Sequence, residues 1–91
     1  MPTRYTVTVT PEAVAQLTAL WIQASSADRA ATSRASGRID RELREDADQR
    51  GHLLAGGSRP SRVIRFPPLR AIFDVSEPDR LVWIRSYALA P

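Results

Sequence analysis

The sequence predicts a single small α+β domain with the element order β-α-α-β-β-β. Apolar residues alternate near the N-terminus and in the last third of the chain, and between these parts they recur every three or four residues. The 91 residues are enough for one compact core and too few for two, so we expect one domain over residues 1–91. Since 43% of the residues are hydrophobic and 25% charged, as in globular proteins, extensive disorder is excluded.

The N-terminal half begins with a strand and continues with a helix. Residues 5–9 place Tyr and Val on one side and Thr on the other, as in a half-buried strand. Thr10 offers an N-cap hydroxyl and Pro11 suits the first helical position, so a helix begins there and ends near Ser25. Its apolar stripe consists of Val14, Leu17, Leu20, Trp21 and Ala24.

A second helix is expected between Ser25 and Gly51. Ser25 lies three residues ahead of Asp28, a spacing similar to a capping box, and Gly51 is a suitable C-terminal cap. The apolar positions are spaced by four residues: Ala31, Ala35, Ile39, Leu43 and Ala47. The arginines of this helix, Arg34, Arg38, Arg41 and Arg44, are interpreted as a solvated face that forms ion pairs one turn apart.

Three strands are predicted in the last third, at residues 62–66, 69–75 and 81–87, with turns at the two prolines 67–68 and at 77–79. In the second strand, alternation places Leu69, Ala71, Phe73 and Val75 on the core face. In the third, it places Val82, Ile84 and Ser86 inward and Leu81, Trp83, Arg85 and Tyr87 outward.

The hairpin of the last two strands is expected to place Asp74 opposite Leu81, Ile72 opposite Trp83 and Arg70 opposite Arg85 on the open face. Opposed like charges are destabilising. The pair therefore indicates either a different register or a site that receives an anion.

The net charge of +3 indicates an acidic partner. Every basic residue that carries this charge is an arginine, whose guanidinium group binds phosphate or carboxylate with two parallel hydrogen bonds.

No cysteine is present, which excludes disulfides and thiolate chemistry. His52 is the only histidine, so we expect no metal site and no cofactor. No apolar run approaches the roughly 20 residues of a membrane span, and we expect a cytoplasmic protein without membrane contact.

Three segments carry a resemblance to a known family: TPEAVAQLTAL after the first strand, RELREDADQRG at the end of the second helix, and PPLRAIFDVSEPDRLVWIRSYAL in the final hairpin. In this order they resemble the RelE/ParE toxins of bacterial type II toxin–antitoxin modules. The resemblance implies a helical hairpin packed on one face of an antiparallel sheet. It also implies an acidic antitoxin that covers the toxin, as a hetero-oligomer, while association with a second copy stays open.

Two activities follow from the resemblance. Members similar to RelE bind the ribosome and cleave mRNA, whereas members similar to ParE inhibit DNA gyrase. The first would make the chain a metal-independent endoribonuclease with Arg70, Tyr87 and Arg85 as catalytic candidates. The candidates for substrate binding are Arg59, Arg62, Arg65 and Trp83.

Two departures favour gyrase inhibition: the sequence has no lysine, and it ends at Pro91 without the C-terminal helix of many such nucleases. RNA cleavage also needs a general base, which arginine does not supply at neutral pH. The base would be His52, Tyr87 or Asp74. The alternative interpretations are an exposed loop residue for His52 and a residue packed at the end of the sheet for Tyr87. Arg70 could instead form an ion pair with Asp74 or with an acidic helix residue. A basic interaction module unrelated to toxins is the third reading of the sequence.

Overall fold

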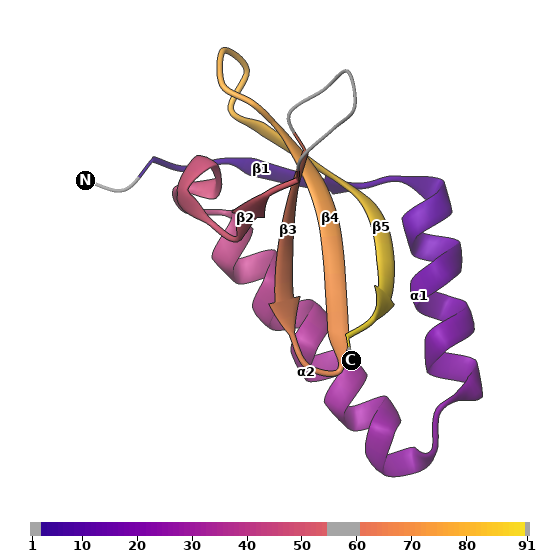
Figure 1. Cartoon of the computed structure of the whole chain (residues 1–91). Coiled ribbons are helices and arrows are strands. Elements are labelled where there is room, and N and C mark those ends of the chain that lie inside the picture. The colour runs from indigo at the N-terminus through magenta and orange to yellow at the C-terminus, as the bar shows by residue number, and fades with distance from the viewer. Residues whose placement is uncertain (1–2, 55–60, 91) are drawn as a thin grey trace.

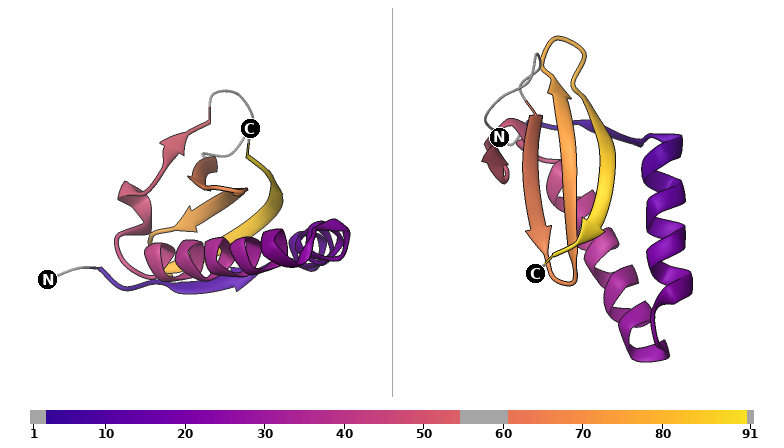
Figure 2. Two further views of the ribbon diagram at one scale, coloured as in Figure 1. Left: turned by 90° about the horizontal axis from the view of Figure 1, so that it is seen from below. Right: turned by 45° about the vertical axis from the view of Figure 1, so that its right-hand side comes forward.

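A computed structural model describes residues 3–54 and 61–90, and it has two helices on one face of a five-stranded sheet (Figures 1 and 2). The α+β class and the predicted order of the main elements are confirmed. The elements are β1 (Thr6–Val9), α1 (Pro11–Gln23), α2 (Ser26–Leu43), the 3-10 helix η1 (Ala47–Gln49), β2 (His52–Leu53), β3 (Ser61–Phe66), β4 (Leu69–Ser76) and β5 (Leu81–Leu89).

The sheet is mixed, with the strand order β1-β5-β4-β3-β2. Strands β2 to β5 are antiparallel, as expected, whereas β1 runs parallel to β5. A parallel pair needs a long connection, and here both helices and three strands separate β1 from β5. Strand β2 was not predicted, because two residues carry no periodicity.

Both helices begin where the capping residues predict. The Thr10 hydroxyl accepts a hydrogen bond from the Ala13 N–H at 3.2 Å, and the Ser25 hydroxyl accepts one from the Asp28 N–H, also at 3.2 Å. Each bond satisfies an N–H that has no partner within its helix. The two helical starts are therefore determined by local sequence.

The end of α2 differs from the prediction, because the helix stops at Leu43 instead of continuing towards Gly51. Asp46 has a left-handed backbone with φ of 51° and is tied to the N-terminal segment. Its side chain accepts from the Thr3 N–H and its own N–H donates to the Thr3 carbonyl, both at 2.8 Å. Ala47 remains fully buried, but in η1. A contact 43 residues away in sequence thus ends the helix.

The core lies between the two helices and the sheet. Its largest fully buried side chains are Phe73, Ile39, Leu43, Leu69, Ile84 and Val82. The predicted inward face of the second strand is confirmed, since Leu69, Ala71 and Phe73 are all fully buried. Within the described ranges, neither helix is long and apolar enough to cross a membrane.

The predicted hairpin register between β4 and β5 is wrong by two residues at the turn. Ser76, not Asp74, lies opposite Leu81, so Asp74 faces Trp83. A bulge then interrupts the ladder, since Ile72 pairs with Ser86 and the next residue of β4 pairs with Ile84. Arg85 is the extra residue of β5, and every side chain beyond it changes face.

Candidate functional site

The face of the sheet opposite the helices, called here the open face, carries most of the candidate residues. Because Leu69, Ala71 and Phe73 point into the core, the residues between them in β4 point the other way. Cross-strand pairing extends this face over four strands. Its members are His52, Ser61, Val63, Arg65, Arg70, Ile72, Asp74, Trp83, Ser86 and Ala88, with Arg85 at the bulge.

Two arginines do oppose each other on the open face, but they are Arg65 and Arg70, on β3 and β4. Arg70 faces Ala88 on β5, so the predicted pairing of Arg70 with Arg85 is wrong. Directly opposed residues have Cβ atoms about 5 Å apart, a separation at which like charges repel. We call Arg65 and Arg70 the arginine pair.

The arginine pair has no counter-ion among the described residues. Arg65 is exposed, whereas Arg70 is half-buried and its Nε atom is buried without a hydrogen-bond partner in the described part of the chain. A buried donor without a partner costs free energy. An anion bound between the two guanidinium groups would remove the repulsion between them.

Asp74 pairs with Arg85 and not with Arg70. Arg85 Nη1 lies 3.4 Å from Asp74 Oδ2 and donates to the Ser61 hydroxyl at 3.2 Å. Ser61 in turn donates to Asp74 Oδ1 at 2.6 Å. This network neutralises Arg85, which was a catalytic candidate, and leaves Arg70 without the partner that the sequence suggested.

Arg62 lies on the opposite face from the arginine pair and has a structural role. It is paired with Phe73, a core residue, and its guanidinium binds two backbone carbonyls. Nε donates to the Arg50 carbonyl at 2.6 Å and Nη2 donates to the Gly51 carbonyl at 3.2 Å. These bonds hold the segment that leads into β2. Another substrate-binding candidate, Arg59, lies outside the described residues.

Tyr87 is buried, so its predicted outward orientation is wrong. Only 5% of the residue is exposed, because the bulge at Arg85 turns it towards the core. Burial, with a smaller contribution from Asp40, raises the pKa of the Tyr87 phenol from 10.0 to about 12. Its N–H donates to Gln16 Oε1 at 2.9 Å. A buried phenol with a raised pKa is poorly suited to accept a proton from a ligand on the open face.

His52 joins the open face through β2, a segment that the sequence predicts to be a loop. It pairs with Val63, so its exposed side chain lies on the same face as Arg65, two residues further along β3. Diagonal neighbours in an antiparallel pair are about 7–8 Å apart, a separation that long side chains can bridge. The short alternation after Gly51, with His52 on one face and Leu53 on the other, is the only sequence signal for this placement.

Trp83 is exposed, as predicted, with 43% of its surface accessible. It lies between Asp74 on β4 and Thr8 on β1. The open face therefore combines a basic end at the arginine pair with an aromatic side chain nearer the other end. Within residues 3–54 and 61–90, no group of three His, Cys, Asp or Glu residues has the arrangement of a metal site.

Comparisons with known proteins identify the fold. No protein-family model matches the sequence. No curated protein matches it either. Among solved structures, a chain of the chromosomal ParDE toxin–antitoxin system from P. aeruginosa is similar, with a TM-score of 0.73 and 15% identity over 97% of this chain and 98% of that chain.

The toxin–antitoxin complex RelBE2 from Mycobacterium tuberculosis contains a second similar chain. Its TM-score is 0.67, with 20% identity over 97% of this chain and all of that chain. Both matches extend over nearly the whole sheet and both helices. The chain therefore shares its fold with these two chains.

Proposed function

We propose that the chain, as one domain, is the toxin of a type II toxin–antitoxin module and stops growth by cleaving mRNA on the ribosome. The observation that carries this proposal is the arginine pair on the open face, which has no counter-ion among the described residues. Two guanidinium groups on directly opposed residues suit a phosphodiester, whose oxygens accept bidentate hydrogen bonds. Acting on the ribosome would place the protein in the cytoplasm.

The chemistry divides between the arginine pair and His52. Arg65 and Arg70 would bind the scissile phosphate and stabilise the negative charge that builds on it in the transition state. His52 would accept the proton of the ribose 2′-hydroxyl, as imidazole does in many general-base reactions. The 2′-oxygen then bonds to phosphorus, the bond to the 5′-oxygen breaks, and the 5′-oxygen takes a proton from water. The products are a 2′,3′-cyclic phosphate and a 5′-hydroxyl.

The proposed partner is an acidic antitoxin that covers the open face. Both similar chains come from toxin–antitoxin assemblies. The arginine pair would attract carboxylates, and the exposed Trp83 would contribute apolar area to the interface. An antitoxin bound there would block RNA and neutralise the toxin.

Gyrase inhibition is the second candidate, and the burial of Tyr87 favours it. With that phenol in the core, His52 is the only imidazole or phenol on the open face among the described residues. Binding to a protein target needs no general base, whereas cleavage does. The same arginine pair would then contact an acidic surface of the enzyme or its bound DNA.

The two candidates are separated by pulse-labelling bacteria after induced expression. An early fall in methionine incorporation supports mRNA cleavage, and an early fall in thymidine incorporation supports gyrase inhibition. A normal rate of both would contradict toxin activity and favour the basic interaction module. The His52→Ala variant sharpens the result, because it should abolish cleavage while leaving a purely binding toxin active.

The arginine pair is tested with Arg70→Ala and Arg65→Ala in a purified assay with ribosomes and mRNA. Loss of one charge-assisted contact to the transition state costs about 2–3 kcal/mol, which corresponds to roughly 30- to 150-fold in rate. Arg34→Ala is the matched control, because Arg34 is an exposed arginine on α2, away from the open face. Equal activity of Arg70→Ala and Arg34→Ala, with both proteins folded, would refute the site.

A further inference from the structure

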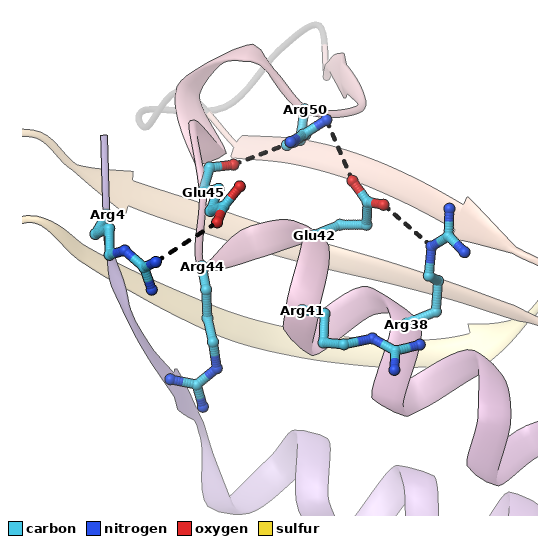
Figure 3. Close-up of a pocket in the computed structure, with 7 residues that line it drawn as sticks. All are labelled: Arg4, Arg38, Arg41, Glu42, Arg44, Glu45 and Arg50. Atoms are coloured by element: carbon cyan, nitrogen blue, oxygen red, sulfur yellow. Dashed lines mark hydrogen bonds and ion pairs between the residues drawn. The ribbon is translucent and has the colours of Figure 1, made fainter. Parts of the chain in front are cut away.

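A second basic surface lies away from the open face, where the end of α2, the segment before β1 and the segment after η1 meet (Figure 3). It is a hollow of about 430 Å³. Five arginines line it: Arg4, Arg38, Arg41, Arg44 and Arg50. We call it the arginine hollow. The sequence pattern predicts only a solvated, ion-paired face for its helical arginines.

Two glutamates also line the hollow, and they neutralise it only in part. Glu42 is shared, with Arg38 Nε at 3.0 Å from Oε1 and Arg50 Nη1 at 3.2 Å from Oε2. Glu45 has a weaker ion pair with Arg4, at 3.9 Å. Each carboxylate carries one negative charge, so Glu42 cannot neutralise two guanidinium groups at once. Figure 3 shows the Arg50–Glu42–Arg38 chain of contacts.

Arg41 forms no ion pair with any described residue, and its exposed side chain projects from α2 one turn after Arg38. Arg44 is held by Asp40, which lies outside the lining, at 2.9 Å. The five arginines and two glutamates of the lining have a net charge of +3, as large as that of the whole chain. When Arg44 is counted as neutralised by Asp40, the net charge of the lining is still +2. The excess positive charge is thus concentrated in this hollow.

The position at the C-terminal end of α2 opposes anion binding, but too weakly to reverse the sign. The helix dipole contributes the equivalent of about −0.5 charge at this end. Arg50 adds positive charge just beyond this end, where its Nε donates to the Glu45 carbonyl at 3.1 Å. Against a net lining charge of at least +2, the field in the hollow favours an anion.

We propose that the arginine hollow binds an oligophosphate, a ligand with two or more linked phosphate groups. Its volume lies within the range of small-molecule sites, about 300–1,000 Å³, and exceeds what one phosphate needs. Guanidinium groups from three separate segments can contact successive phosphates with bidentate hydrogen bonds. None of the described residues that line the hollow is aromatic, so recognition rests on the phosphates and not on a stacked base.

Occupation of the hollow would stabilise the fold. Arg4 precedes β1, Arg41 lies on α2 and Arg50 follows η1, so one ligand would connect three segments. A ligand that binds only the folded chain raises its resistance to unfolding. The site is separate from the arginine pair, and its test does not depend on the activity of the chain.

The experiment is calorimetric titration of the purified full chain with inorganic tripolyphosphate, orthophosphate and a ten-nucleotide RNA at one fixed salt concentration. We expect tripolyphosphate to bind at least tenfold more tightly than orthophosphate, because it contacts several arginines at once. It should also raise the melting temperature. Arg41→Ala should weaken tripolyphosphate binding at least tenfold and remain folded, since Arg41 makes no ion pair within the described ranges.

Arg34→Ala is the control, because Arg34 is an exposed arginine of the same helix that does not line the hollow. Equal loss in both variants would show general attraction to a basic surface and overturn the proposal. Tighter binding of the RNA than of tripolyphosphate, lost in Arg41→Ala, would also overturn it, since the hollow would then be a nucleic-acid contact. An Arg41→Lys variant keeps the charge but loses the bidentate fork. It should bind tripolyphosphate more weakly than the parent chain and more tightly than Arg41→Ala.

Discussion

The same substitution, glycine to alanine, should have opposite effects at Gly51 and Gly37. Gly51 has a left-handed backbone with φ of 63°, where an L-residue with a Cβ atom is strained by about 1–2 kcal/mol. A Cβ atom there would overlap the Val63 carbonyl oxygen and lie 2.8 Å from its carbon. Both atoms belong to the backbone of β3, so no side-chain rotation relieves the clash.

The overlap forces β2 away from β3, because Val63 is the residue that pairs with His52. Strain and the partial loss of this pairing together should cost Gly51→Ala about 2–4 kcal/mol of folding free energy. Gly37, in contrast, lies in the middle of α2, and a Cβ atom there would meet nothing within 4 Å. Alanine at that position should stabilise the chain by about 1 kcal/mol, through helix propensity and the lower entropy of the unfolded chain.

Urea unfolding monitored by circular dichroism measures the change in unfolding free energy of both variants. The Gly37→Ala protein is the matched control, because it carries the same glycine-to-alanine replacement. For a chain of this size, 1 kcal/mol corresponds to a shift of about 4–8 °C in melting temperature. Amide exchange gives a local readout, because the Leu54 N–H donates to the Ser61 carbonyl at 2.8 Å and should exchange faster in Gly51→Ala. A Gly51→Ala protein as stable as the parent, with unchanged exchange at Leu54, would refute the placement of β2.

Three further predictions concern the tyrosines, the open face and the first helix. Burial raises the pKa of both tyrosines from 10.0 to about 12, and hydrogen bonds to two carboxylates contribute for Tyr5. The protonated phenols therefore stabilise the fold fully below pH 10, and this contribution is lost as the pH rises towards 12. A titration of tyrosinate absorbance should show a native midpoint near 12 that returns to about 10 in denaturant, and a native midpoint near 10 would contradict the burial of Tyr5 and Tyr87. Binding of the proposed antitoxin should shield Trp83 from quenchers. The measurement uses the Trp21→Phe variant, because the two tryptophans are similarly exposed, at 43% and 42%. Unchanged quenching would place the interface elsewhere. Thr10→Ala should lower the unfolding free energy by about 1 kcal/mol through loss of the N-cap, and an unchanged melting temperature would show that the hydroxyl caps nothing.

Local sequence signals predicted the elements that depend on local interactions. The caps at Thr10 and Ser25 and the alternation in β4 are properties of neighbouring residues, and the structure confirms all three. The end of α2 depends instead on Asp46, whose hydrogen bonds with Thr3 join distant parts of the chain. The apolar spacing continues through this position to the buried Ala47, so periodicity alone extends the helix too far.

The candidate site depends on register, which periodicity alone does not determine. Alternation predicts correctly that Arg70 lies on the open face. The prediction that Arg85 on β5 lies opposite Arg70 is wrong, because the β4–β5 turn is shorter than expected. The arginine opposite Arg70 is Arg65 on β3. A single extra residue, Arg85, then reverses the faces of β5, so Trp83 before it is exposed and Tyr87 after it is buried. Candidates on the two sides of this bulge therefore need different tests. Loss of activity in a Trp83 variant with normal stability would report on contacts at the open face, whereas the same loss in a Tyr87 variant would first have to be separated from damage to the core.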